Sequence, residues 1–104
     1  MIIYNITLNI EHEVLERCLD YLQKEFIPQS LSSGHLDTPR LRRILYDHTE
    51  DAASYALQFH VKDIGDLEEW LQKDGRDLQG RLMMEFGPSI IGFTTLLEDI
   101  ALGF

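Results

Sequence analysis

The residues best suited to acid–base chemistry lie on an alternating segment near position 60. His60 and Gln58 are two residues apart, and in a strand this spacing places both side chains on one face. Imidazole can act as an acid or a base near neutral pH, so His60 is the candidate catalytic residue. A lone strand histidine is more often an ordinary surface residue, and this alternative stays open.

Candidate ligand-binding residues come from three segments that we expect to be strands. They are Asn5, Thr7, Arg42, Arg43 and Gln58. Arginine recognises carboxylates and phosphates through paired hydrogen bonds, so Arg42 and Arg43 favour a small anionic or polar ligand. In an acidic chain, pairing of these arginines with the protein's own carboxylates is the alternative. The alternation slips at these two positions, which leaves open which arginine faces inward and allows a β-bulge there.

The sequence contains no motif for a metal or a cofactor. His12, His35, His48 and His60 lack the close helical or strand spacing to a His, Cys or carboxylate that is typical of metal sites. No H-E-x-x-H pattern, phosphate-binding glycine loop or nucleophile elbow occurs. We therefore expect no metal and no cofactor. Cys18 falls on the apolar stripe of a predicted helix and is expected to be a buried thiol.

Composition limits the classes of partner. The chain has 104 residues, which predicts a single domain over 1–104, and a net charge of −9. Nucleic-acid phosphates and anionic membrane surfaces repel such a surface, so we expect neither partner. A single cysteine cannot form an internal disulfide. No signal sequence is evident and the apolar runs are far shorter than ~18 residues, which predicts a soluble cytoplasmic protein.

The first half of the chain predicts a strand, a helix and another strand. Residues 2–10 alternate with period two, as in a strand with one buried face. Residues 11–26 change to helical spacing, and Pro28 is expected to stop this helix. Pro28 could also open a short turn that ends at Gly34. Residues 40–47 then form the first strand of a hairpin.

The second half repeats this order. Residues 54–62 form the second hairpin strand after a link over residues 48–53, and residues 66–86 form a helix with a capping pair at Asp66 and Glu69. Gly75 predicts a break near residues 73–76. Gly87-Pro88 ends the helix, residues 89–97 form a last strand, and the tail over 98–104 is unassigned.

The order βαββαβ predicts an α+β fold of ferredoxin-like type, with two helices on one face of a four-stranded antiparallel sheet. The helix-covered face is expected to hold the apolar sets Tyr4/Ile6/Leu8, Tyr55/Leu57/Phe59 and Ile91/Phe93. The other face would hold Asn5, Thr7, Asn9, Gln58, His60 and Thr94, with Arg42 or Arg43 nearby. This face is either a solvated surface or a polar pocket, open or closed by a second protomer.

Several segments resemble a known family: residues 1–10, Phe26-Ile27-Pro28, Ser33-Gly34, Arg40-Leu41, residues 55–59, Phe86-Gly87 and residues 93–97. They resemble a small bacterial family known as a domain of unknown function. The chain is more distantly similar to the dimeric α+β barrel group, which contains small monooxygenases, stress-response and haem-degrading proteins. That resemblance implies a homodimer packed sheet to sheet. Asn5 and Trp70 are similar to residues of the haem-degrading members, but no histidine follows His60, so no haem ligand is implied.

Two functions of different classes follow from these expectations. One is a homodimeric small-molecule-binding module, or a cofactor-independent enzyme of oxygenase, isomerase or lyase type, with its pocket on the polar sheet face. The enzyme type is implied only by the resemblance. The alternative is a non-catalytic domain that binds a protein through its sheet edge or its dimer surface.

Overall fold

The computed structural model describes residues 1–45 and 50–104, and it confirms the βαββαβ order. The strands are β1 (Ile2–Glu11), β2 (Leu36–Arg43), β3 (Ala52–Val61) and β4 (Ile90–Glu98). The α-helices are α1 (Leu15–Tyr21), α2 (Ile27–Leu31), α3 (Ile64–Trp70) and α4 (Arg76–Phe86). Short helical turns precede α1 and follow α4, over His12–Val14 and Gly87–Ser89.

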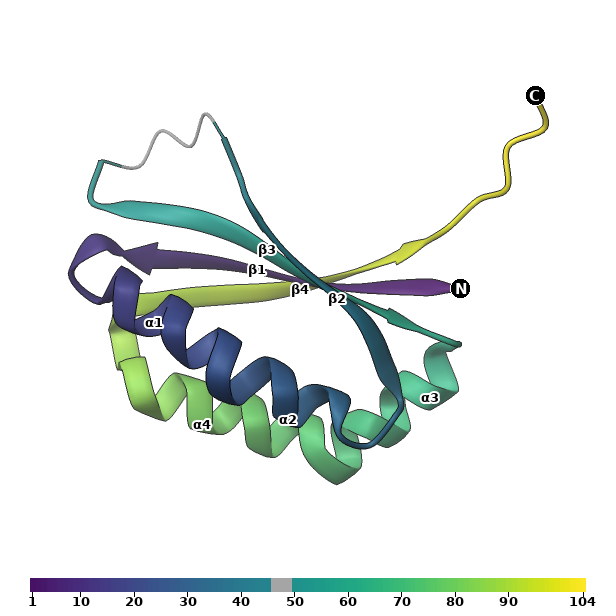
Figure 1. The fold of residues 1–104 in the computed structure, drawn as a ribbon, viewed down its shortest axis with the longest axis horizontal. Helices are drawn as coiled ribbons and strands as arrows, with labels where there is room; N and C mark the ends of the chain where they lie inside the picture. The colour runs from purple at the N-terminus through teal and green to yellow at the C-terminus, as the bar shows by residue number, and fades with distance from the viewer. Residues whose placement is uncertain (46–49) are drawn as a thin grey trace.

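The four strands form one antiparallel sheet in the order β2-β3-β1-β4. Figure 1 shows all the helices on one side of this sheet and none on the other. The core lies between these two layers. Its largest fully buried side chains include Trp70, Phe26, Phe59, Leu8 and Ile10. One sheet face is therefore covered, and we call the other the open face.

The first helical segment continues through Pro28, so the prediction that this proline stops the helix is wrong. A π turn over Leu22–Phe26 joins α1 to α2, and the N–H of Ile27 donates to the carbonyl of Leu22, five residues back. Proline lacks the N–H that an α-helical turn requires. The wider turn brings Pro28 to the beginning of α2, where that donor is not needed. Gly34, with φ of 82°, ends the segment as predicted.

The second helical segment begins and bends differently from the prediction. The N-cap is Asp63 rather than Asp66, and its Oδ1 accepts from the N–H of Asp66 at 2.8 Å. The expected break is a π turn over Leu71–Gly75, through which the chain stays helical. A Cβ atom at Gly75 would lie 2.4 Å from Cζ3 of Trp70, so the indole ring occupies the space that any other residue would need.

The hairpin between β2 and β3 begins earlier in the chain than predicted. β2 starts at Leu36 and ends at Arg43, and the register shifts between Asp37 and Arg40, where Thr38 has φ of 49°. The irregularity therefore lies before the arginines and not at Arg42–Arg43. The predicted strand over 40–47 is too long at its end, because Ile44 and Leu45 follow β2 without strand structure. Residues 46–49 lie outside the described part of the chain, so the predicted turn at His48 is not addressed.

The prediction for the two faces of β4 is wrong. Thr7 pairs with Phe93 and Ile6 pairs with Thr94, so Phe93 lies on the open face and Thr94 on the helix side. Ile91 likewise lies on the open face. Gly92 explains the register, because a Cβ there would lie 2.9 Å from Cδ2 of Leu8, whose side chain fills the helix-facing layer at this point.

Candidate functional site

Four rows of side chains cross the central part of the open face. The rows follow from the strand pairings and are Asp37–His60–Ile3–Leu97, Arg40–Gln58–Asn5–Thr95, Arg42–Ala56–Thr7–Phe93, and a row that contains Ser54, Asn9 and Ile91. Five of the six predicted site residues lie on this face: Asn5, Thr7, Arg42, Gln58 and His60. Arg43 does not, because it pairs with Tyr55 on the opposite side of the sheet.

Four of these residues form a continuous chain of hydrogen bonds across β2, β3 and β1. We call this chain the polar row, and it joins members of the second and third rows above. Arg42 Nη1 donates to Gln58 Oε1 at 2.8 Å, and Gln58 Nε2 donates to Asn5 Oδ1 at 3.2 Å. Asn5 Nδ2 then donates to Thr7 Oγ1 at 3.0 Å. Although it lies on the open face, Asn5 is only 7% exposed, because its neighbours surround it.

The direction of donation is fixed from Arg42 to Thr7. A guanidinium can only donate, so it selects the carbonyl oxygen of Gln58 and turns the amide NH₂ group of Gln58 towards Asn5. The same logic turns the Asn5 NH₂ group towards the hydroxyl of Thr7. Thr7 accepts and keeps its own proton, while Arg42 keeps further N–H groups. Both ends of the polar row therefore present hydrogen-bond donors, and each bond polarises the next.

His60 lies beside the polar row but outside it. Its cross-strand neighbours are Ile3 on β1 and Asp37 on β2, and the ring is half-buried. Among residues 1–45 and 50–104, the structure gives the imidazole no hydrogen-bond partner. A general base is normally oriented by a third group, so the catalytic role of His60 stays a prediction.

An apolar margin flanks the polar row along β4. Ile91 and Phe93 are 67% and 61% exposed, and Leu97 is also exposed. We call these three residues the apolar rim. Exposed apolar side chains gathered along one strand are a candidate interaction surface.

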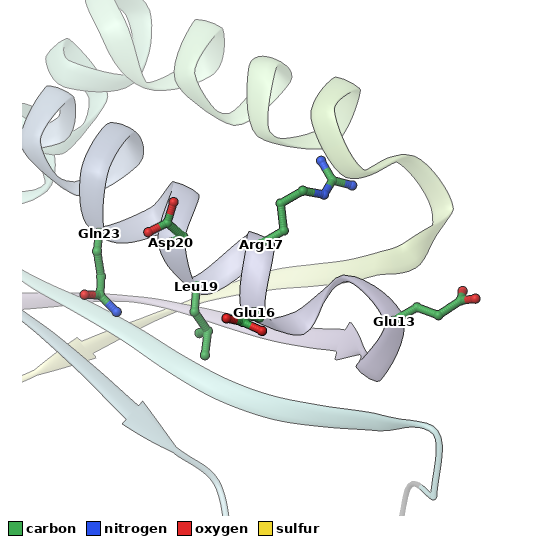
Figure 2. A pocket seen from close by; sticks show the side chains of 6 residues that line it. All are labelled: Glu13, Glu16, Arg17, Leu19, Asp20 and Gln23. Atoms are coloured by element: carbon green, nitrogen blue, oxygen red, sulfur yellow. The ribbon is translucent and has the colours of Figure 1, made fainter.

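Two hollows of the surface lie beside the helices. One, of about 660 Å³, runs along α1, and Figure 2 shows that its side chains diverge. Arg17 points to α4, where it pairs with Glu85 at 3.2 Å, whereas Glu13 points into solvent. A binding site needs polar groups that converge, so this hollow is an ordinary helix surface. A smaller apolar cleft of about 220 Å³ lies between α4 and β4.

Two buried groups have perturbed ionisation for structural reasons. Cys18 is a fully buried free thiol, as predicted, and burial raises its pKa to about 11 against the opposing charge of Arg17. Burial also raises the pKa of Tyr4, and the hydrogen bond from Gln79 opposes this shift. Both groups are neutral at physiological pH, and Cys18 is an unreactive core residue.

One cluster escaped sequence reasoning altogether. Ligand-type atoms of His35, Asp66 and Glu69 all lie within 4.8 Å of one another, and we call these three residues the corner cluster. His35 is 31 positions before Asp66, so no local spacing links them. The i, i+3 spacing of Asp66 and Glu69 is visible in the sequence, but the same spacing is typical of a helix cap.

With this geometry described, the chain can be placed in a family. Residues 1–100 match the family described as a domain of unknown function, DUF4286, and the chain belongs to it. No match was found among curated proteins. Within the described residues, no helix combines the length and the apolar character needed to cross a bilayer.

Solved structures with the same fold cover nearly the whole chain at low identity. An EthD family protein from Bacillus halodurans has a TM-score of 0.70 at 17% identity, over 96% of this chain and 100% of that one. A putative antibiotic biosynthesis monooxygenase from Deinococcus radiodurans gives 0.66 at 13%, over 100% and 98%. A dimeric ferredoxin-like protein from an uncultured marine organism gives 0.59 at 14%, over 98% of both chains. These likenesses show the ferredoxin-like fold.

Proposed function

We propose that the protein is a homodimeric small-molecule-binding module in which two open faces pack together and enclose a pocket for a small anionic or acceptor-rich molecule. The observation that carries this proposal is the polar row, which presents donors at both ends on a face bordered by the apolar rim. A surface that is both apolar at its margin and hydrogen-bonded at its centre suits an enclosed, oriented ligand better than bulk water.

The sizes of the side chains in the third row support an enclosed space. Arg42 and Phe93 are large and stand on the outer strands, whereas Ala56 and Thr7 are small and stand on the inner strands. Two such faces that meet at their margins leave room between their centres. Dimerisation would also remove Phe93 from water, which is worth roughly 1.5–3 kcal/mol for a side chain that becomes fully buried.

The ligand chemistry follows from Arg42. Its guanidinium carries several N–H groups in a planar fork that matches a carboxylate or a phosphate, and within residues 1–45 and 50–104 only the bond to Gln58 uses one of them. Thr7, on β1, offers the ligand a second donor through its hydroxyl proton. An oxyanion on the ligand is therefore the group that the pocket would recognise, with an apolar part against the rim.

The dimer and the enzyme type are carried over from similar folds. A protein of this fold is described as dimeric, and another as a putative antibiotic biosynthesis monooxygenase. Cofactor-independent oxygenase, isomerase or lyase chemistry belongs to this proposal by analogy of fold. His60 is the residue that would supply acid–base chemistry, since it lies two positions from Gln58 on the same face.

A second candidate function is protein binding without catalysis, and the C-terminal edge of the sheet favours it. β4 pairs only with β1 in the described sheet, so its outer edge is available to an added strand. The tail beyond β4 extends away from the body in Figure 1 and exposes Ile100, Leu102 and Phe104. In this case the partner would cover β4 and its tail, and the polar row would stay in water.

Arg42 and Arg43 form a matched pair for the ligand test. They are adjacent exposed arginines on β2, but the pairings place them on opposite sides of the sheet. We expect Arg42→Gln to weaken binding of inorganic phosphate or benzoate roughly 10- to 100-fold, since a hydrogen bond to a charged group contributes about 1.5–3 kcal/mol. Arg43→Gln should bind as the unchanged protein does, by isothermal titration calorimetry. Equal affinities in all three proteins, or no binding of either probe, would contradict the proposed pocket.

Phe93 and Met84 separate the dimer from the second candidate. Both are exposed apolar residues, but Met84 lies on α4, at 86% exposure, away from the open face. We expect Phe93→Glu to convert the dimer to a monomer in light scattering, because it would bury a charge, whereas Met84→Glu should stay dimeric. A monomeric wild-type protein would favour the second candidate instead.

A further inference from the structure

The corner cluster lies away from the open face, where the turn before β2 meets α3. We propose that His35, Asp66 and Glu69 bind one divalent transition cation of the zinc class. The three side chains supply an imidazole nitrogen and two carboxylates, and all three ligand atoms lie within 4.8 Å of one another. This site is independent of the proposed pocket.

Separate structural features hold the three side chains in place. Gly34, in a left-handed conformation, turns the chain after α2. Leu36 follows His35 directly and is only 1% exposed, so its burial anchors the chain next to His35. Asp66 and Glu69 are three residues apart on α3 and therefore lie on the same helix face. The His35 side chain is only 16% exposed, so its ring has little freedom to move elsewhere.

The ring nitrogens of His35 have distinct surroundings. Nδ1 lies 3.0 Å from the hydroxyl oxygen of Ser33, and Nε2 lies 3.5 Å from Oε2 of Glu69. Histidine ligands usually hold one nitrogen by such an outer contact and offer the other to the metal. Bonds of about 2.0–2.1 Å to a tetrahedral zinc place two ligand atoms roughly 3.3 Å apart, close to the separation of Nε2 and Oε2. The half-buried carboxylate of Asp66 and the exposed carboxylate of Glu69 can close the remaining distance by rotation.

Lys73 positions the carboxylate of Glu69. Its Nζ lies 2.6 Å from Oε1 of Glu69, so Oε2 is the oxygen that faces His35. This contact therefore leaves Oε2 of Glu69 as the oxygen that would bind the cation.

The mixed donor set determines the kind of cation. One imidazole and two carboxylates suit Zn²⁺, Co²⁺ or Ni²⁺, whereas Mg²⁺ and Ca²⁺ prefer oxygen ligands alone. Three protein ligands leave a position for water or for an added ligand. A bare ion pair between protonated His35 and Glu69 is the competing interpretation of the same geometry, and it predicts no cation binding.

The test is a titration of the full chain with Zn²⁺ by isothermal calorimetry, with far-UV circular dichroism to confirm that each variant is folded. We expect one cation per chain, with saturable binding lost in His35→Ala and in Asp66→Asn. His12→Ala is the matched control, because His12 is an exposed histidine outside the cluster, and it should bind as the unchanged protein does. Ser33→Ala should bind roughly 10-fold more weakly, as expected for loss of an outer contact.

Nitrogen-15 chemical shifts of the histidines give a second readout. Zn²⁺ should shift Nε2 of His35 and leave the rings of His12 and His60 unchanged. The proposal is overturned if Zn²⁺ does not saturate the protein, if His35→Ala binds as tightly as the unchanged chain, or if the metal shifts Nδ1 of His35.

Discussion

Replacement of Gly75 by alanine tests how the second helical segment holds the core. An alanine in place of glycine within a helix usually stabilises a protein by about 0.5–1 kcal/mol. At Gly75 the new Cβ would lie 2.4 Å from Cζ3 and 2.6 Å from Cε3 of Trp70, far inside contact distance. The indole is fully buried and cannot move into solvent. Overpacking of this kind costs about 1–3 kcal/mol, so we expect a net loss of about 1–2 kcal/mol.

Gly80 provides the matched control on the same segment. It is an exposed helical glycine with nothing within 4 Å of an added Cβ, so Gly80→Ala should gain about 0.5–1 kcal/mol. For a chain of this length, Gly75→Ala should lower Tm by about 4–16 °C and Gly80→Ala should raise it. Thermal unfolding, followed by the fluorescence of the single Trp70, measures both. If Gly75→Ala raised Tm as Gly80→Ala does, the packing of Trp70 on the π turn would be refuted.

Two further predictions concern buried ionisation and helix capping. The pKa of Cys18 is raised to about 11 from 9.0, so the unfolded thiol ionises first and stability should fall as pH rises from about 9 to about 11. Urea unfolding across this range should show a shallower fall in Cys18→Ala, and an unchanged fall would contradict the assignment. Asp63→Ala removes the acceptor of the Asp66 N–H and should lower the free energy of unfolding by about 0.5–2 kcal/mol. Asp63→Ser keeps an acceptor and should retain most of that free energy. Equal losses for the two variants in urea unfolding would contradict the cap.

The fold was predictable because hydrophobic periodicity is local. Period two over residues 2–10 and 54–62, and helical spacing over residues 11–26 and 66–86, carried most of the element order, which the structure confirms. The two π turns were not predictable in this way. Gly75 reads as a weak helix residue in sequence, but it is there because the ring of Trp70 occupies the place of its side chain. At the π turn over Leu71–Gly75, the contact of Trp70 with Gly75 is what local periodicity does not show.

The candidate site was likewise predictable only where local alternation decides it. Alternation identified Asn5, Thr7 and Gln58, but it could not choose between Arg42 and Arg43, since the bulge that sets their faces lies upstream, between Asp37 and Arg40. Alternation also permits either face for β4, and a one-residue difference in register exchanges every side chain between faces.

The corner cluster depends on contact between segments far apart in the chain. His35 comes directly before β2, whereas Asp66 and Glu69 lie on α3, and only the fold brings them together. No search by local spacing can find such a group of ligands.

Native mass spectrometry of the purified full chain tests the central claim most directly, because it measures assembly and retained ligand together. The account predicts a species of twice 12.1 kDa, with any additional mass arising from a small anionic molecule that Arg42→Gln releases. A protein that stays at 12.1 kDa across the accessible concentration range would contradict the enclosed pocket between two open sheet faces.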